Sequence, residues 1–519
     1  MVGVVSMPEQ MIEKLKKNIL PQWKTCLITA LIVGLITHVY KITNWIPNWD
    51  SLVFRYDAQN MLSMGRWFLP VACGFSSFYD LPWLTGLLAI LFHALGAVCI
   101  LKIFDVQKKT TAALVGALVV SFPTVTSVML YQYVSDGYSL SFLLSCLAVV
   151  FMTNKKPRYV LSAILIALSV GIYQAYITTA IMLLIAYFIF ELLYRDKKIS
   201  DILKQVAKCA LAGGVGMGLY YVIWNILLKM TGTEILAYQG MESAASLSGL
   251  DIRSSLYTIK HSFTDYFFNF ADGVQLFDIL NVIIFVFTVV FYVVDIIKEK
   301  ISPIKLLLVV ICAAVLPVGA SMLAFVNGTM DYHNLMKMGF LVFYLFFLLA
   351  YDQTTYKSKA FSHAKAWMIF IVMFVLLWNQ AVIANVSYHK LEIAYEKSFG
   401  TLIRIADRIE EIEGTQNLDR VLVIGALSDS EAYSVNLPPD MTGTTDGYIL
   451  RADDEIVHQS VFCSALNDYA GKNYRFVHAE EKQALLLTDE VQNMGFWPEK
   501  NAIAIIDDVI VIKLGTESE

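Results

Sequence analysis

The sequence is dominated by long runs of apolar residues that contain almost no charge. The chain has 519 residues, of which 57% are hydrophobic and only 16% are charged, whereas a soluble domain carries about 25% charged residues. A helix needs about 20 apolar residues to cross the roughly 30 Å of hydrocarbon in a bilayer. Runs of this kind recur through residues 1–384. The sequence therefore predicts a polytopic α-helical membrane protein.

About eleven of these runs are candidates for membrane-spanning helices. Several are shorter than a full span, and we expect their flanking aromatic residues to extend them into the interface. The fifth and sixth are separated only by Gln174 and Ala175, which predicts a tight helical hairpin. The predicted spans are 26–40, 84–103, 111–130, 139–152, 159–173, 176–194, 209–228, 279–297, 306–326, 338–351 and 367–384.

The basic residues indicate an orientation in the membrane. Lysine and arginine concentrate near the N-terminus and in segments 102–109, 155–158, 195–208, 298–305 and 357–365. The positive-inside rule places such segments in the cytoplasm. We therefore expect a multi-pass protein of the cytoplasmic (inner) membrane with its N-terminus inside. Two long loops, 41–83 and 229–278, and the tail after residue 384 are then expected outside.

The tail differs in character from the membrane part. "YEKSFGTLIRIADRIEEIEG" (395–414) has apolar residues at helical spacing. "RVLVIGA" (420–426) has the pattern of a buried strand, and "AIAIIDDVIVIKLG" (502–515) reads as two strands around Asp507 and Asp508. We expect residues 385–519 to form a small extracytoplasmic α/β domain, in which no catalytic motif is evident.

The first long loop carries ionisable groups beside the membrane. "NWDSLVFRYDAQNMLSMGRW" (48–67) contains Asp50, Asp57, Arg55 and Arg66, and Asp80 follows. A carboxylate shielded from water can act as a general base, and an arginine can bind a phosphate through two parallel hydrogen bonds. The alternative is a solvated loop whose surface ion pairs contribute little. Composition alone leaves both interpretations open.

Two other motifs carry polar residues between apolar runs. In "YQYVSDGYSLSF" (131–142), Asp136 stands at the expected start of a helix, where helix capping is the alternative to a substrate contact. "GIYQAYI" (171–177) contains Tyr173 and Gln174 at the tip of the predicted hairpin. Gln174 either satisfies the backbone of the turn or contacts a sugar hydroxyl.

A further motif, "NGTMDYHNLMKMG" (327–339), combines three kinds of ionisable group. Asp331, His333 and Lys337 supply a carboxylate, an imidazole and a cation within seven positions. A histidine without an evident partner is more often structural than catalytic. Lys337 is equally compatible with an anchor to lipid headgroups.

The order of these motifs resembles a known family. "NWDSLVFRYDAQNMLSMGRW", followed by "YVSDGYSLSFLLS" and "GIYQAYI", is similar to the bacterial serotype-converting (O-antigen) glucosyltransferases of type II, which are GT-C-like polytopic enzymes. The resemblance covers residues 20–384. The C-terminal part corresponds only by position.

The resemblance implies a glycosyltransferase that takes a sugar, glucose in this family, from a polyprenyl-phosphate-linked donor. The acceptor would be a hydroxyl of a surface glycan at the outer face of the cytoplasmic membrane. Implied partners are this donor, the glycan and the bilayer, with a polyprenyl-phosphate glucosyltransferase and a flippase in the same pathway. The sequence contains no P-loop and no dinucleotide-binding glycine motif, and we expect no cofactor, no metal and no nucleic-acid partner.

In that scheme each candidate residue receives a role. Asp50 is the first choice for general base and Asp57 the second, in a reaction that inverts the anomeric centre. Arg66, Arg55 and Lys337 are expected to bind the donor phosphate. The remaining expected substrate contacts are Asp80, Asp136, Tyr173, Gln174, Asp331 and His333.

Two other functions remain open from the sequence. A glycolipid flippase or transporter would place charged residues along a pathway through its spans, whereas those of this chain cluster in loops. A surface-polysaccharide polymerase would emphasise large outer loops that carry arginine, for which Arg253 is the only indication.

Overall fold

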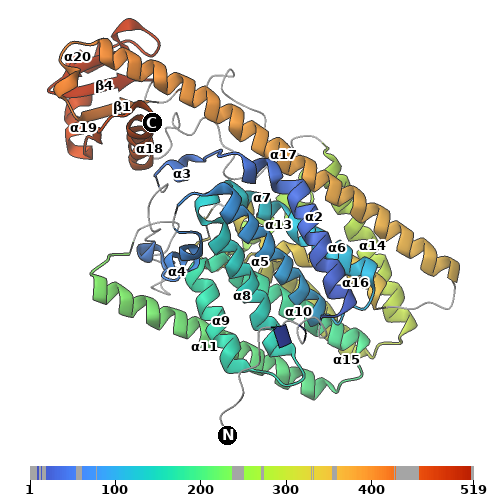
Figure 1. The fold of residues 1–519 in the computed structure, drawn as a ribbon. Helices are drawn as coiled ribbons and strands as arrows, with labels where there is room; N and C mark the ends of the chain where they lie inside the picture. The colour runs from blue at the N-terminus through green and yellow to red at the C-terminus, as the bar shows by residue number, and fades with distance from the viewer. Residues whose placement is uncertain are drawn as a thin grey trace.

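The computed structural model describes residues 9–10, 13, 19–53, 61–77, 79–235, 251–270, 274–328, 330, 332–353, 359–425, 427 and 455–515. The chain is mostly helical, with a small sheet near the C-terminus (Figure 1). The elements of the first half are α2 (Pro21–Thr43), α3 (Trp49–Val53), η1 (Leu62–Met64), α4 (Leu69–Cys73), η2 (Gly74–Ser76), α5 (Pro82–Ile103), α6 (Lys109–Ser121), α7 (Pro123–Leu130), η3 (Gln132–Val134), α8 (Ser135–Thr153), α9 (Tyr159–Ile172), η4 (Gln174–Tyr176), α10 (Ile177–Tyr194) and α11 (Ile199–Thr231).

The second half begins with α13 (Ile252–Phe267), α14 (Leu276–Lys298), α15 (Pro303–Ala320), η6 (Met322–Phe325), η7 (Asn334–Phe340), α16 (Leu341–Asp352) and α17 (Lys359–Glu411). It ends with η8 (Thr415–Asn417), β1 (Arg420–Ile424), α18 (Glu455–Ala470), β2 (Arg475–Phe476), α19 (Ala479–Leu486), α20 (Asp489–Gln492), η9 (Lys500–Ala502), β3 (Ile503–Ile506) and β4 (Val509–Lys513).

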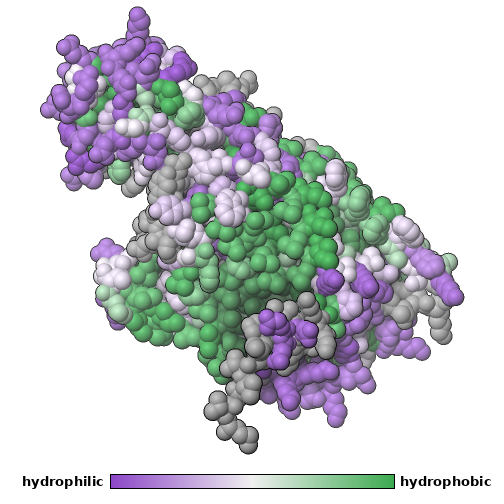
Figure 2. Space-filling model, in the orientation of Figure 1, coloured by the Kyte–Doolittle hydropathy of each residue, from purple (hydrophilic) through white to green (hydrophobic). Residues whose placement is uncertain are grey.

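The membrane part contains ten helical segments, within the described residues, that are long and apolar enough to cross a bilayer. The helix α9 is apolar but has only 14 residues. Each of the predicted spans overlaps one of these segments or α9, so the prediction of a polytopic helical membrane protein is confirmed. Figure 2 shows a hydrophobic surface over the bundle, with hydrophilic surfaces on the C-terminal part and at the opposite end.

Close helix contacts form the centre of the bundle. The helix α5 packs between α2 and α8, and α8 in turn packs against α9. Glycine permits the contact between α2 and α6, because a Cβ added at Gly116 would lie 2.5 Å from the backbone oxygen of Cys26. The segment from α6 to α7 and the helices α10 and α16 are largely buried among these neighbours.

The third predicted span is interrupted between α6 and α7. Helix α6 ends at Ser121 because Pro123 lacks the backbone N–H that would continue it. Near this break, His38 Nε2 donates to the backbone oxygen of Val120 at 2.8 Å. Its Nδ1 therefore accepts from the hydroxyl of Tyr388, 2.7 Å away. This histidine joins α2, the break and α17.

The helix α17 is continuous over 53 residues. It includes both the last predicted span, 367–384, and most of the predicted tail helix, 395–414. At 1.5 Å per residue it is about 80 Å long, much longer than the hydrocarbon is thick. Figure 1 shows it passing along the bundle and reaching the C-terminal sheet. The predicted boundary between residues 384 and 385 lies inside this helix, and the division into two domains stays a prediction.

The C-terminal part forms a four-stranded sheet in the order β2-β1-β4-β3. Strand β1 pairs in parallel with β2 and β4, and β3 and β4 form an antiparallel hairpin. Asp507 and Asp508 make its two-residue turn with φ of 49° and 58°, left-handed values that aspartate tolerates in such turns. The small α/β fold and its three longer strands are as predicted.

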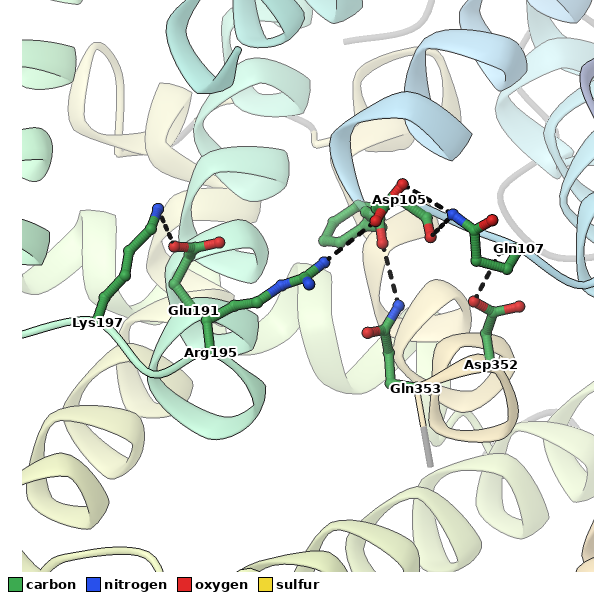
Figure 3. Close-up of polar contacts among 8 residues, drawn as sticks. Asp105, Gln107, Glu191, Arg195, Lys197, Asp352 and Gln353 are labelled. Atoms are coloured by element: carbon green, nitrogen blue, oxygen red, sulfur yellow. Dashed lines mark hydrogen bonds and ion pairs between the residues drawn. The ribbon is translucent and has the colours of Figure 1, made fainter. Parts of the chain in front are cut away.

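The two ends of the bundle bring together different segments. We call the end that carries residues 44–81 the loop end, and there these residues contact η3, η4 and α18. At the opposite end, the segments that follow α5, α10 and α16 meet (Figure 3). This grouping matches the segments that the basic residues assign to one side and the other.

A polar network fastens the opposite end, as Figure 3 shows. The Asp352 carboxylate accepts from the backbone N–H of Gln107 at 3.2 Å and of Lys108 at 3.0 Å. Since Lys108 directly precedes α6, the carboxylate satisfies N–H groups at a helix N-terminus, where negative charge is stabilising. Arg195 forms an ion pair with Asp105 at 3.5 Å. One carboxylate thus joins α16 to α6.

Replacing Asp352 by alanine is expected to destabilise the bundle by about 1–2 kcal/mol, the usual effect of losing a helix cap. The purified variant in detergent should unfold at a lower temperature than the wild-type protein. Asp196→Ala is the matched control, because Asp196 is an exposed aspartate in the adjacent loop. Equal unfolding temperatures for Asp352→Ala and the control would contradict a capping role.

Candidate functional site

The short helix α3 positions Asp50 at the loop end. Asn48 Oδ1 accepts from the backbone N–H of Ser51 at 2.9 Å and from its hydroxyl at 3.0 Å. This is the geometry of a helix cap. Asp50 lies in the first turn of α3 and is half-buried. The hydroxyl of the buried Tyr133 donates to Asp50 Oδ2 at 3.3 Å. Two elements distant in sequence thus fix this carboxylate.

Arg66 lies against a stacked pair of tyrosines. Gly65 ends η1 with φ of 76°, a conformation that favours glycine, and Arg66 follows directly. The Tyr138 and Tyr173 rings stack with centroids 4.4 Å apart and planes inclined by 8°. Arg66 Nη1 donates to the Tyr138 hydroxyl at 2.9 Å, and its Cζ lies 5.0 Å from the centroid of the Tyr173 ring. The aromatic contacts stabilise the cation and fix its orientation.

Tyr133 connects these two groups. Its hydroxyl is hydrogen-bonded to Asp50 and interacts electrostatically with Arg66 as well. Tyr138, which binds Arg66, is also within electrostatic range of Tyr133. The structure therefore brings together a carboxylate and a guanidinium that the sequence analysis assigned to one site. Arg66 is half-buried, as is Asp50, so both are accessible in part.

Contacts with the hairpin at Gln174 and with α11 hold residues 62–64 of the first loop in position. Gln174 Nε2 donates to the backbone oxygen of Met64 at 2.7 Å and to the Tyr220 hydroxyl at 3.3 Å. Trp224 Nε1 donates to the backbone oxygen of Leu62 at 2.8 Å. Gln174 thus holds the backbone of the first loop and not that of its own turn, a contact that neither of its two sequence interpretations named, and its contact with a sugar stays a prediction.

Asp80 belongs to a different part of the loop end. It is buried and accepts from Trp45 Nε1 at 3.2 Å. The buried ammonium group of Lys41 interacts electrostatically with it. These contacts favour a charge-balancing role for Asp80 over direct contact with substrate.

Asp136 is buried in the first turn of α8. It does not occupy the cap position, which is Val134. Its Oδ1 accepts from the N–H of Gly137 at 2.9 Å, and its side chain contacts Cys73. Burial raises the pKa of the Cys73 thiol well above its ordinary value, and the Asp136 charge raises this pKa further. Asp136 thus packs against the end of the first loop.

Another cation at the loop end is Lys337, in η7. It is only 2% exposed, and its Nζ lies 5.7 Å from the centroid of the Tyr266 ring. His333 directly precedes η7. Because η7 packs against η4, and Tyr173 adjoins η4, Lys337 and Arg66 lie at the same end of the bundle.

Three of the predicted site residues lie outside the described residues: Arg55, Asp57 and Asp331. Their roles stay predictions.

The C-terminal part contacts the loop beside Asp50. The helix α18 packs against α3 and α17. The Trp45 ring lies edge-on to Tyr395 of α17, with centroids 6.0 Å apart, and 6.3 Å from Tyr469 of α18. Aromatic contacts of this kind are favourable beyond the area that they bury. They fix the C-terminal part next to the candidate site.

Three residues of this arrangement were not singled out from the sequence: Lys41, Tyr133 and Tyr138. The tyrosines belong to a motif in which they read as ordinary membrane-interface anchors. Lys41 reads as the polar end of the first apolar run. The sequence feature that could have identified Lys41 is its position, because it is a lysine at the end of the bundle where basic residues are scarce.

Comparison with known proteins bears on the whole membrane part. The family model described as "Glucosyl transferase GtrII" matches residues 39–376. No curated protein and no solved structure matches the chain. The matched region contains Asp50, Arg66 and Lys337 and more than half of the chain, and it confirms the resemblance drawn from the motifs. The chain belongs to the GtrII family of glucosyl transferases.

Proposed function

We propose that this membrane glucosyltransferase moves glucose from a polyprenyl-phosphate-linked donor to a hydroxyl of a surface glycan, at the outer face of the cytoplasmic membrane. The observation that carries the proposal is the placement of Asp50 and Arg66 around Tyr133 at one end of a membrane bundle. A lipid-linked glycosyl donor presents its phosphate at the end of the hydrocarbon. A base and a phosphate-binding cation are needed at that depth.

In the proposed reaction, Asp50 removes the proton of the acceptor hydroxyl as its oxygen attacks the anomeric carbon of the sugar. The bond between that carbon and the phosphate oxygen breaks, and the electron pair leaves with the phosphate. A single displacement of this kind inverts the anomeric configuration. The hydrogen bond from Tyr133 orients the carboxylate.

Arg66 stabilises the charge that develops on the departing polyprenyl phosphate. Its guanidinium is preorganised, because Tyr138 and Tyr173 fix its orientation before substrate binds. Its geometry suits a phosphate with two acceptor oxygens. Lys337, in η7 next to η4, supplies a second cation for the donor phosphate. Tyr173 acts indirectly, because its ring holds Arg66 in place.

The distribution of buried charges favours transfer over lipid flipping. A flippase pathway would need charged groups across the middle of the bundle. In the described spans, the buried carboxylates and ammonium groups lie within about two helical turns of an end of their helix. These residues are Lys41, Asp136, Glu191, Asp278, Asp295, Lys337 and Lys365.

The basic residues at the end of the bundle opposite the loop end support the proposed orientation in the membrane. The segments that meet at the end opposite the loop end carry Lys108, Arg195 and Lys197. By the positive-inside rule that end faces the cytoplasm. The loop end and the C-terminal part then face outward, where the C-terminal part, fixed beside α3, borders the path of the acceptor glycan.

The surface glycan of cells that contain or lack the gene tests the proposed function. Mass spectrometry should detect an added hexose on the glycan repeat only in cells with the gene. The modification should disappear in a host that lacks polyprenyl-phosphate glucose, and NMR of the glycan should show an anomeric configuration opposite to that of the donor. Modification that persists without the lipid donor would exclude it as the source of the sugar.

A further inference from the structure

Lys41 is an unusual lysine because it is almost completely buried. It lies in the last turn of α2 and is 1% exposed. A lysine at the end of a membrane helix normally extends its ammonium group toward water or headgroups. Burial of an ammonium group is costly unless it is fully hydrogen-bonded and its charge is compensated. The contacts of Lys41 therefore indicate what it holds in place.

Two of these contacts reach the segment that carries Asp50 and the segment that carries its hydrogen-bond donor. Lys41 Nζ donates to the backbone oxygen of Ile46, and it donates to Gln132 Oε1 at 2.6 Å. Ile46 lies two residues before Asn48, the residue that caps the helix of Asp50. Gln132 directly precedes Tyr133, whose hydroxyl binds the Asp50 carboxylate.

The contacts form a closed circuit. From Lys41 it passes through Ile46 and the Asn48 cap to Asp50. It returns from Asp50 through Tyr133 and Gln132. One ammonium group thus holds both the segment that carries the carboxylate and the segment that carries its hydrogen-bond donor.

The charge of Lys41 is compensated by Asp80. Asp80 interacts electrostatically with Lys41 and is bound by Trp45, the residue just before Ile46. This interaction explains how a buried cation is tolerated near the candidate base. It also gives the segment 44–48 a second connection to Lys41, through Trp45 and Asp80.

We propose that Lys41 is a positioning residue for the transfer reaction, which sets the position of Asp50 relative to Tyr133 and thereby to the acceptor hydroxyl. This inference rests on the proposed function, in which Asp50 is the base. A positioned general base is effective only within hydrogen-bond reach of the proton that it takes. A displacement of about 1 Å is enough to cost roughly 10²-fold in rate.

Lys41→Met is the first test, because methionine has a similar length and is apolar. Turnover of polyprenyl-phosphate glucose, with glycan from a strain lacking the gene as acceptor, should fall by roughly 10²-fold in kcat. The KM for the donor should change little, since Arg66 and its tyrosines are outside the circuit. Lys24→Met is the matched control, an exposed lysine of the same helix, and it should retain wild-type turnover.

Gln132→Met breaks the circuit at another bond and provides a double-mutant cycle. If both residues act through their shared hydrogen bond, the double variant should lose little more kcat than Lys41→Met alone. Multiplicative losses would contradict the circuit. So would a well-folded Lys41→Met protein with kcat within twofold of wild type, or a loss only in the amount of folded protein.

Hydrogen–deuterium exchange separates failure of this inference from failure of the proposed function. In Lys41→Met, amides of segments 44–53 and 132–134 should exchange faster, while those of 62–76 should not. This comparison needs no donor. Unchanged exchange in 44–53 would overturn the positioning role even if activity is lost. A wild-type protein that does not use the lipid donor would overturn the function and leave the exchange result to decide on Lys41.

Discussion

Asp50→Asn is expected to lower kcat for glucose transfer by roughly 10²–10⁴-fold, the usual contribution of a positioned general base. Asparagine keeps the shape and the hydrogen bond from Tyr133 but cannot take up a proton at neutral pH. Binding of polyprenyl-phosphate glucose should be nearly unchanged, because the base acts on the acceptor. Initial rates and donor binding by the purified variant in proteoliposomes measure both quantities.

The comparison variant for this experiment is Asp57→Asn. Asp57 is the alternative base from the sequence, and it lies outside the described residues. If Asp57→Asn abolishes transfer while Asp50→Asn remains nearly normal, the assignment of the base is reversed. If both variants remain active, neither carboxylate is the base.

Arg66→Ala should impair donor binding and turnover together, because a phosphate contact acts in both the ground state and the transition state. A charge-assisted hydrogen bond contributes about 1.5–3 kcal/mol, which corresponds to a decrease in kcat/KM of roughly 10- to 100-fold. Arg66→Lys should recover only part of this loss, since an ammonium group cannot reproduce the stacked, two-pronged guanidinium.

Arg253→Ala is the matched control for the arginine, because Arg253 is an exposed residue in the first turn of α13. It should leave kcat/KM unchanged. A large loss in Arg253→Ala together with normal transfer in Arg66→Ala would place the phosphate site on the second loop. It would also favour the polymerase alternative that the sequence left open.

The helices were largely predictable because an uncharged apolar run of sufficient length has few alternatives to a membrane helix. The hairpin around Gln174 and the turn at Asp507 were also predictable, because in each case two polar or small residues separate two apolar runs. It was harder to predict whether a helix continues past the end of its apolar run or breaks within it. Helix α17 passes through residue 384 because no proline interrupts it, whereas the third span breaks at Pro123.

The candidate site could be predicted only in part. The ionisable residues of the first loop were evident from their contrast with the apolar runs. Their partners were not, because Arg66 and Tyr138 are 72 positions apart and only helix packing brings them together. The buried environment of Lys41 depends on η3 and on Asp80, and no local pattern around Lys41 indicates either.

The central claim is that a lipid-linked phosphate is the leaving group at the loop end. The most direct measurement reconstitutes the purified protein in proteoliposomes with radiolabelled polyprenyl-phosphate glucose or with radiolabelled UDP-glucose, and with glycan from a strain lacking the gene. The account predicts that label reaches the glycan only from the lipid donor, with wild-type protein but hardly with Asp50→Asn. Transfer from UDP-glucose without the lipid, or equal transfer by wild-type protein and Asp50→Asn, would contradict it.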